Sequence, residues 1–276
     1  MQEHAKLSYL PDYQNPPVVE SILGVQFNRL PKLTSFHLGS FWETLNHDEW
    51  PTLLETPALL PQFEKFDEPD AKWDIGQIRL GEFLASGNRM QIKNQTSDGM
   101  IQIQNGRIHF NWLGKGNEYP RYDHLKNSFS SAFQRFVDFI GSQKLGELNP
   151  NQWEVTYLNH IPKGTVWTSP ADWTFFRPLC SASTPTPVTL ESFGGEWHYV
   201  IPEKRGRLHV ALQHGEKDGL AIIVLTLTAR GPLPEKANRE CVLESLDFGR
   251  GIIVRSFEKL MTDEANTYWG LKNASS

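Results

Sequence analysis

Hydrophobic residues near the start of the chain recur at every second position, which is the period of a β-strand. The stretch 18–27 is therefore predicted to be a strand with one buried face. Its apolar positions on that face are Val19, Leu23, Val25 and Phe27. Between residues 38 and 45 the apolar positions are instead three and four apart, which predicts a short amphipathic helix. Residues 46–72, with their prolines, are expected to form an irregular surface connection.

The clearest local signal in the chain is the pair Asn105-Gly106, which favours a two-residue type I′ turn. That turn pairs apolar with apolar and polar with polar residues on both faces of the hairpin. The predicted cross-strand pairs are Gln104–Arg107, Ile103–Ile108, Gln102–His109 and Ile101–Phe110. The pair Asp98-Gly99 carries the same signal upstream, so this region is predicted to be an antiparallel meander.

A long helix is predicted after the meander, because apolar residues form one wide stripe while charged residues lie outside it. The stripe consists of Leu125, Phe129, Ala132, Phe133, Phe136, Phe139 and Ile140. A face of this width is suited to covering a β-sheet.

The same order of elements is predicted a second time. A strand covers residues 153–157, and a short helix capped at Ser169 runs to Phe176. A second meander turns at Gly194-Gly195, and its later strands cover residues 207–213 and 219–228. The predicted sequence of strand, helix, meander and long helix therefore occurs twice.

A last helix completes the second unit, with Leu246, Gly249, Ile253, Phe257 and Leu260 on its apolar stripe. At one fixed offset, Leu125, Phe136 and Phe139 of the first long helix match Leu246, Phe257 and Leu260 of the second. This match indicates an internal duplication.

The predicted fold class is α+β, with two β-α-β(3-4)-α halves whose antiparallel strands carry long helices packed on one side. The halves are expected to comprise residues 1–148 and 149–276. This order is that of the TATA-binding-protein-like duplicated architecture, an analogy of fold that transfers no function.

Composition narrows the class of protein. The net charge is −5 and the pI is about 6.0, so the basic excess typical of nucleic-acid-binding proteins is absent. The one basic stretch, Lys204-Arg205-Gly206-Arg207, is predicted to be a turn between strands. Two cysteines, a polar start and no long apolar stretch favour a cytoplasmic protein that does not enter a membrane.

The sequence holds no phosphate loop, nucleotide-binding glycine fingerprint, nucleophile elbow or zinc-protease helix. The sequence therefore favours a non-enzymatic protein with no cofactor and no catalytic residue, and an enzyme stays an alternative. His209 and His214 are the nearest approach to a metal-ligand pair, but in a regular strand they point to opposite faces, so no metal is expected.

Two sets of residues are candidates for binding. The polar cluster Tyr157, Asn159 and His160 ends the strand that opens the second half, near the midline where clefts form. The densest aromatic and polar patch is Asn111, Trp112, Tyr119, Arg121 and Tyr122. Such residues form hot spots of protein interfaces and also stack on unpaired bases. The alternative for both sets is a structural role, in which these side chains pack locally or cap the ends of strands.

Several motifs resemble an uncharacterised prokaryotic family of about this length that is sporadically distributed among bacteria and archaea. They are Asn15-Pro16-Pro17-Val18-Val19-Glu20, Gly24 to Phe27, Gln102 to Trp112, Tyr119 to Tyr122, Val155 to His160 and Trp269-Gly270. The resemblance implies no established activity, cofactor or catalytic residue. Sporadic distribution is typical of mobile accessory genes, including defence systems.

Three hypotheses of function follow. The leading one is a non-enzymatic protein-interaction or regulatory module with a protein partner, as a subunit of a mobile accessory or antiviral defence system. The second is a nucleic-acid-binding protein that uses a concave sheet, which the net charge does not favour. The third is an enzyme or small-ligand binder with a site between the halves.

Overall fold

The computed structural model describes residues 10–66, 87–115, 118–169, 175–179 and 192–272. These residues form an α+β fold built on one nine-stranded antiparallel sheet. The strands are β2 (Val18–Phe27), β3 (Thr52–Pro57), β4 (Asn88–Lys93), β5 (Gly99–Gln104), β6 (Arg107–Leu113), β7 (Pro150–Pro162), β8 (Gly194–Ile201), β9 (Gly206–Lys217) and β10 (Leu220–Pro232). A two-stranded sheet of β1 (Asp12–Tyr13) and β11 (Leu271–Lys272) joins the two ends of the described chain.

The strand order in the sheet is β3-β4-β5-β6-β2-β7-β10-β9-β8. The central pair, β2 and β7, contains the first strand of each predicted half, and it keeps a regular register from Glu20 to Gln26. On each side of that pair the next strand outward is the last of a meander, β6 or β10, and the earlier strands follow outward in reverse order. The sheet is therefore continuous across the predicted boundary between halves.

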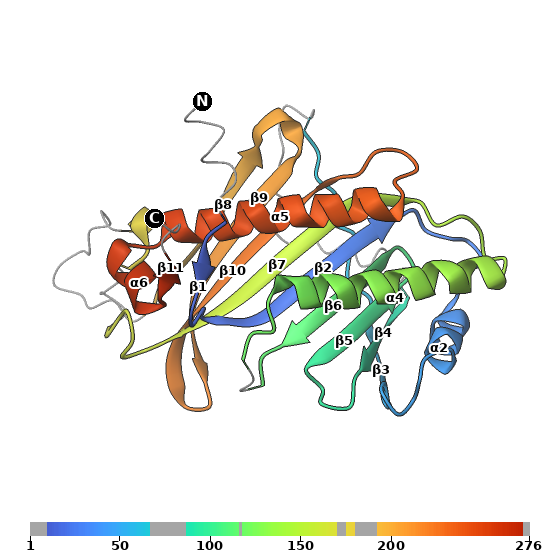
Figure 1. Ribbon diagram of the computed structural model, residues 1–276, viewed down its shortest axis with the longest axis horizontal. Helices are drawn as coiled ribbons and strands as arrows, with labels where there is room; N and C mark the ends of the chain where they lie inside the picture. Colours follow the sequence, from blue (N-terminus) through green and yellow to red (C-terminus); the bar gives the residue numbers. More distant parts are fainter. Residues whose placement is uncertain (1–9, 67–86, 116–117, 170–174, 180–191, 273–276) are drawn as a thin grey trace.

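Helices cover one face of this sheet (Figure 1). The helix α4 (Tyr122–Ser142) packs on β6 and β2, α5 (Arg239–Leu260) packs on β7 and β10, and α2 (Ser35–Glu43) packs on β4 and β5. A short helix, α6 (Asp263–Tyr268), follows α5, and two single 3₁₀ turns, η1 (Arg177–Leu179) and η2 (Pro202–Lys204), lie in loops. No helix among the described residues is long and apolar enough to span a membrane.

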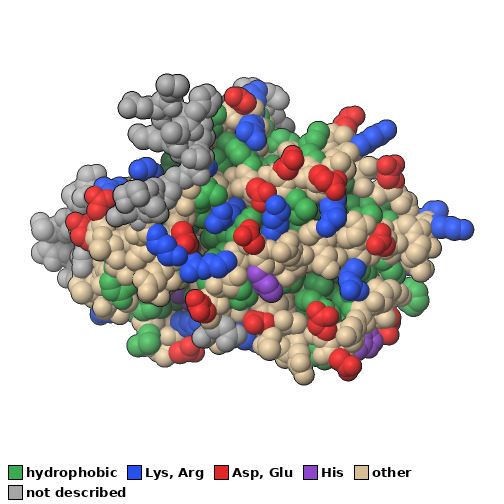
Figure 2. Space-filling view, in the orientation of Figure 1, with side chains coloured by type: hydrophobic (Ala, Val, Ile, Leu, Met, Phe, Trp, Pro, Cys, Tyr) green, Lys and Arg blue, Asp and Glu red, His purple; other side chains and the backbone are tan. Residues whose placement is uncertain are grey.

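The main core lies between the helices and the sheet, where the two predicted apolar stripes are buried. Phe136 of α4 is fully buried and packs on Phe27 of β2 and Phe41 of α2, with ring centroids 5.9 and 5.3 Å away. Phe257 of α5 is buried against Tyr13 and Trp269. On the side seen in Figure 2, acidic and basic side chains are interspersed over the outer surface.

The predicted register of the β5–β6 hairpin is confirmed at all four pairs. The predicted turn type is wrong, because Gly106 alone has a positive φ, +108°, and a type I′ turn needs one at Asn105 as well. The Asn105 side chain instead accepts a hydrogen bond from the Leu30 backbone N–H and donates to the Leu30 carbonyl oxygen, both at 2.9 Å. Contacts with a distant loop therefore decide the backbone geometry of this turn.

Three other expectations are corrected. Gly194 and Gly195 do not form a turn; they lie in β8 and pair with Gln213 and Leu212 of β9. The connection at Asp98 is longer than a two-residue turn, because β4 ends at Lys93 and β5 begins at Gly99. The connection 46–72 contains an edge strand, β3. Most of the predicted helix 169–176 lies outside the described residues.

Candidate ligand-binding site

Every second residue of the strands points away from the main core, to the face of the sheet opposite the long helices. The residues on this face are largely polar. Many of these side chains are nevertheless buried, which is unusual for charged residues. One row crosses six strands in register: Gln102, His109, Gly24, Glu154, Arg230 and Arg207. Another segment of the chain must therefore shield these side chains from water.

The cover is an extended segment, residues 58–66, which we call the strap. Three glutamines of the sheet hold its backbone by hydrogen bonds. Gln104 accepts from the Leu59 N–H and donates to its carbonyl oxygen, at 2.9 and 2.8 Å. Gln26 makes the same two bonds to Gln62, at 3.3 and 2.8 Å. Gln152 accepts from the Glu64 N–H and donates to the Gln62 carbonyl, so side chains satisfy the backbone of a segment that has no strand partner.

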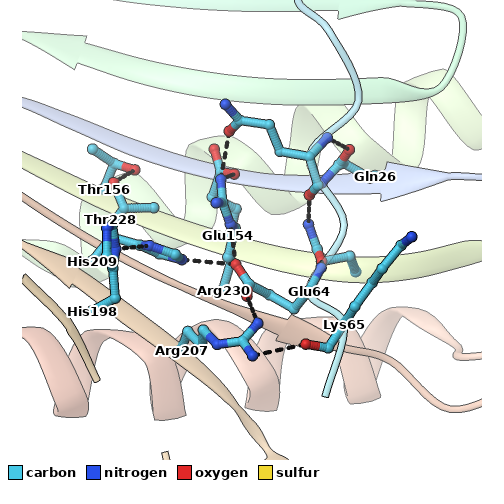
Figure 3. A network of polar contacts seen from close by, with 12 residues as sticks. Gln26, Glu64, Lys65, Glu154, Thr156, His198, Arg207, His209, Thr228 and Arg230 are labelled. Carbon is cyan, nitrogen blue, oxygen red and sulfur yellow. Dashed lines mark hydrogen bonds and ion pairs between the residues drawn. The ribbon is translucent and has the colours of Figure 1, made fainter. Parts of the chain in front are cut away.

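The strap ends in a cluster of charged groups around Glu64, shown in Figure 3. The Glu64 carboxylate is 4 % exposed and accepts from Arg207 Nη1 at 2.6 Å and from Arg230 Nε at 2.5 Å. His209 Nε2 donates to the same carboxylate at 2.7 Å, and His209 Nδ1 lies 2.8 Å from His198 Nδ1. Charge-assisted bonds of this kind are among the strongest in proteins. Glu64 therefore fixes this end of the strap to the sheet, and we call it the latch.

The Glu64 latch is expected to make the protein less stable in acid. Burial alone would raise the pKa of Glu64, but the hydrogen bonds from His209, Arg230 and Arg207 outweigh it and lower this pKa to about 2. Since the unfolded carboxyl has its ordinary pKa of 4.5, the stabilisation is complete above about pH 5 and is lost as the pH falls towards 2. Its size is at most about 3 kcal/mol.

Denaturant unfolding of wild type, Glu64→Gln and Glu43→Gln between pH 7 and pH 3 measures this effect. The wild type should lose stability on acidification, and E64Q should be less stable at pH 7 and lose less on acidification. Glu43, whose side chain is 65 % exposed, provides the matched control, and E43Q should follow the wild type. Parallel curves for E64Q and wild type would contradict the latch.

A cavity of about 430 Å³ lies between the strap and the sheet. Among the described residues, Leu59, Leu60 and Gln62 of the strap line it on one side. The sheet contributes Glu20, Ile22, Arg89, Gln91, Met100, Gln102, Arg107, His109, Asn111 and Glu154. This volume is in the range of sites for small molecules, and nine of the thirteen described lining residues have polar or charged side chains.

A ladder of amide side chains crosses the floor of the cavity. Gln91 donates to Gln102 at 3.2 Å, Gln102 donates to Asn111 at 2.7 Å, and Asn111 donates to the Glu20 carboxylate at 2.6 Å. Burial raises the pKa of Glu20, and the hydrogen bond from Asn111 opposes that effect only in part. The ladder fixes the direction of each amide, so it presents an ordered set of donors and acceptors.

His109 and Glu154 occupy the centre of the floor. The His109 ring lies so close to Gly24 that a Cβ on Gly24 would be 1.9 Å from His109 Cδ2. His109 Nε2 is 3.7 Å from Glu154 Oε1, too far for a hydrogen bond. Within the described residues, neither His109 Nε2 nor Glu154 Oε2 has a hydrogen-bond partner, although both atoms are buried.

Their charge states differ at neutral pH. Burial lowers the pKa of His109 to about 4, so the imidazole is neutral and offers one donor and one acceptor. Burial would raise the pKa of Glu154, but nearby positive charge holds it below its ordinary value. This charge is that of His109, which is protonated only in acid, and of Arg107 and Arg230, so Glu154 is an anion at neutral pH.

The residues predicted as a binding patch are divided between the two faces of the sheet. Asn111 alone belongs to the cavity described above. Trp112, Tyr122 and Tyr157 are buried beneath the helices. The Tyr119 hydroxyl lies 3.0 Å from that of Tyr157, and Tyr122 donates to Asp247 of α5.

The remaining predicted residues have structural partners as well. Arg121 pairs with Asp12 at 2.8 Å, and Asn159 donates to the Leu225 carbonyl at 3.0 Å. His160 is half-buried; its backbone N–H donates to the Pro17 carbonyl, and its Nδ1 is buried without a hydrogen-bond partner among the described residues. Tyr119, Arg121, Tyr157 and Asn159 line a small hollow of about 60 Å³. These contacts match the packing and capping alternative for most of the patch.

His209 and His214 lie on opposite faces of β9, as predicted: His209 binds Glu64, and His214 packs on Trp167. In the described part of the chain, no group of three or more His, Cys, Asp or Glu side chains is placed to hold a metal ion. Comparison of the chain with models of known protein families and with curated proteins gives no match. The case for a function therefore rests on the geometry of the cavity.

Proposed function

We propose that this protein is a non-enzymatic regulatory module that binds a small polar molecule in the cavity beneath the strap. The observation that carries the proposal is the pair of buried polar atoms, His109 Nε2 and Glu154 Oε2, which line the cavity without a hydrogen-bond partner among the described residues. A buried polar group without a partner costs about 1–3 kcal/mol. A ligand that supplies the missing partners recovers that free energy on binding.

The position of the cavity favours this proposal over nucleic-acid binding by an open sheet. The strap crosses the polar face from β5 to β9, so a nucleic acid could not lie on that face without displacing it. The cavity reaches the central strands β2 and β7 through Glu20 and Glu154, which agrees with a ligand site at the midline of the sheet. A protein partner that responds to the bound ligand remains part of the proposal.

We further propose that the two halves, residues 1–148 and 149–276, are duplicates in a TATA-binding-protein-like arrangement. The mirrored strand order around β2 and β7 and the placement of α4 and α5 support it. The resemblance to a sporadically distributed family supports a role as a subunit of an accessory or defence system. A free thiol at Cys241 and the low number of cysteines support a cytoplasmic location.

A screen of small polar metabolites by thermal shift tests the proposed function. A compound present at 100 times its Kd should stabilise the wild type by about 2.7 kcal/mol. Gly24→Ala should abolish that shift, because the new methyl group forces the His109 ring off the sheet and into the cavity.

The matched control is Gly39→Ala, which adds the same methyl group to α2 where nothing lies within 4 Å. G39A should respond to each compound as the wild type does. If every compound that stabilises the wild type also stabilises G24A equally, the cavity is not the binding site.

A further inference from the structure

The two ends of the cavity, taken along β6, carry different chemical groups. Arg107, His109 and Asn111 all point from this strand into the cavity. Four residues of a strand span roughly 13 Å, so Arg107 and Asn111 mark two ends of the site with His109 between them. The Asn111 end holds the amide ladder and Glu20, and the Arg107 end holds guanidinium groups.

Arg107 is buried, with 5 % of its surface exposed, yet it is poorly paired. Among the described residues, its guanidinium makes one hydrogen bond, a long one of 3.5 Å from Nη2 to the Leu60 carbonyl of the strap. Within the same part of the chain, no carboxylate forms an ion pair with its nitrogens. A buried guanidinium normally has such a partner, because leaving its charge uncompensated is costly.

A second arginine adds to the positive charge at this end. Arg89 of β4 also lines the cavity, and its Nε donates to Thr56 at 3.1 Å rather than to a carboxylate. Burial lowers the pKa of both arginines, and for Arg107 the charges of Arg230 and Arg89 lower it further while Glu154 opposes. Both guanidinium groups nevertheless stay protonated at neutral pH.

The carboxylates of this face do not balance these charges. Glu64 is engaged by Arg207 and Arg230, and Glu20, at the other end of the cavity, accepts a hydrogen bond from Asn111. The charge of Glu154 acts on Arg107 and raises its pKa. Glu154 is shared, however, because its Oε2 also lies 3.8 Å from Arg230 Nη1. Arg107 and Arg89 together therefore lack a full counter-charge within the described site.

We propose that the ligand of the cavity is a small anionic metabolite whose phosphate or carboxylate group binds Arg107 and Arg89, and whose hydroxyl or amino groups bind Asn111, Gln102 and Glu20. The fork of a guanidinium group matches either anion with two parallel hydrogen bonds. The amide ladder and Glu20 offer mainly acceptors to groups that carry hydrogens. This inference rests on the proposed ligand-binding function and names the class of ligand.

Calorimetric titration with matched probes tests the inference on the full chain. The phosphate probes are inorganic phosphate and ribose 5-phosphate, the carboxylate probe is glucuronate, and the neutral counterparts are ribose and glucose. At least one anionic probe should bind at least about 10-fold more tightly than its neutral counterpart, the factor expected of a charge-assisted hydrogen bond. The phosphate and carboxylate arms then show which anion the site takes.

Arg107→Gln should weaken binding of that anion by at least about 10-fold and leave the weak binding of the neutral sugar unchanged. Arg205→Gln is the matched control, because Arg205 is exposed and stacks on Phe248 of α5, away from the cavity. R205Q should bind the anion as the wild type does. If R107Q does not fold, Arg89→Gln gives the second test at the same end of the cavity.

Equal affinity for anionic and neutral probes would overturn the inference. So would unchanged anion affinity in R107Q and R89Q, or no binding of any anionic probe at about 10 mM. The proposed function has a separate signature, because neutral compounds that bind the wild type and not Gly24→Ala would uphold ligand binding while the anion inference fails.

Discussion

Residues 1–148 and 149–276, expressed as separate chains, are expected to remain unfolded. The division leaves β2 and β7 as open edges, each with half of its backbone hydrogen bonds unmade. It also removes Arg207 and Arg230 from Glu64, and separates β1 from β11. Each half would expose part of the shared core, so we expect neither to show cooperative unfolding.

Circular dichroism and denaturant titration of each half measure this outcome, with the intact chain as the reference. Co-expression of the two halves is the control, because the complete set of strands should then assemble into the sheet. Two soluble halves that unfold cooperatively by themselves would show that the β2–β7 pair joins two independent domains.

Phe136→Ala is expected to destabilise the protein by about 3–5 kcal/mol, the usual cost of removing a buried phenylalanine ring. Phe136 is fully buried where α4, α2 and the sheet meet, so the cavity left behind cannot be filled by small movements of one element. Phe257→Ala, at the matching position of α5, should cost a similar amount.

Phe36→Ala is the matched control, because the Phe36 ring is 78 % exposed at the start of α2. It should change the free energy of unfolding by no more than about 0.5 kcal/mol. Chemical denaturation of the variants gives the comparison, and a Phe136→Ala cost as small as that of the control would contradict the placement of α4 on the sheet.

Periodicity was sufficient to predict the helices and strands that contribute to the main core. The stripe of α4 depends on residues near one another in sequence, and its burial follows directly from them. In β2 the predicted alternation is confirmed for Leu23, Val25 and Phe27, but Val19 is only partly buried, because the register shifts between Val18 and Glu20. The register of the β5–β6 hairpin was also predictable, since a slip by one residue would turn Ile103 and Ile108 towards the polar face. The turn type was not, because Asn105 bonds to Leu30, which is 75 residues away.

The candidate site was largely missed. The pairs Gln104–Arg107 and Gln102–His109 were predicted correctly, and their polarity suggested a face open to water. That face is buried because the strap covers it, and nothing in the local pattern of the strap predicts where it docks. One signal was present: glutamine, arginine and histidine at alternate positions of neighbouring strands can satisfy a backbone laid across them.

The contacts of Glu64 also determine when the strap can bind to the sheet as the chain is synthesised. Glu64 is separated from Arg207 by 143 residues and from Arg230 by 166, so these are contacts of very high sequence separation. A ribosome adds about 5–20 residues per second, so Arg207 and Arg230 are synthesised roughly 7–33 seconds after Glu64. Loop closure over such a distance is slow and comes late in folding. Because residues 1–148 are not expected to fold alone, we expect the polar face and its cavity to form only after Arg207 and Arg230 have been synthesised.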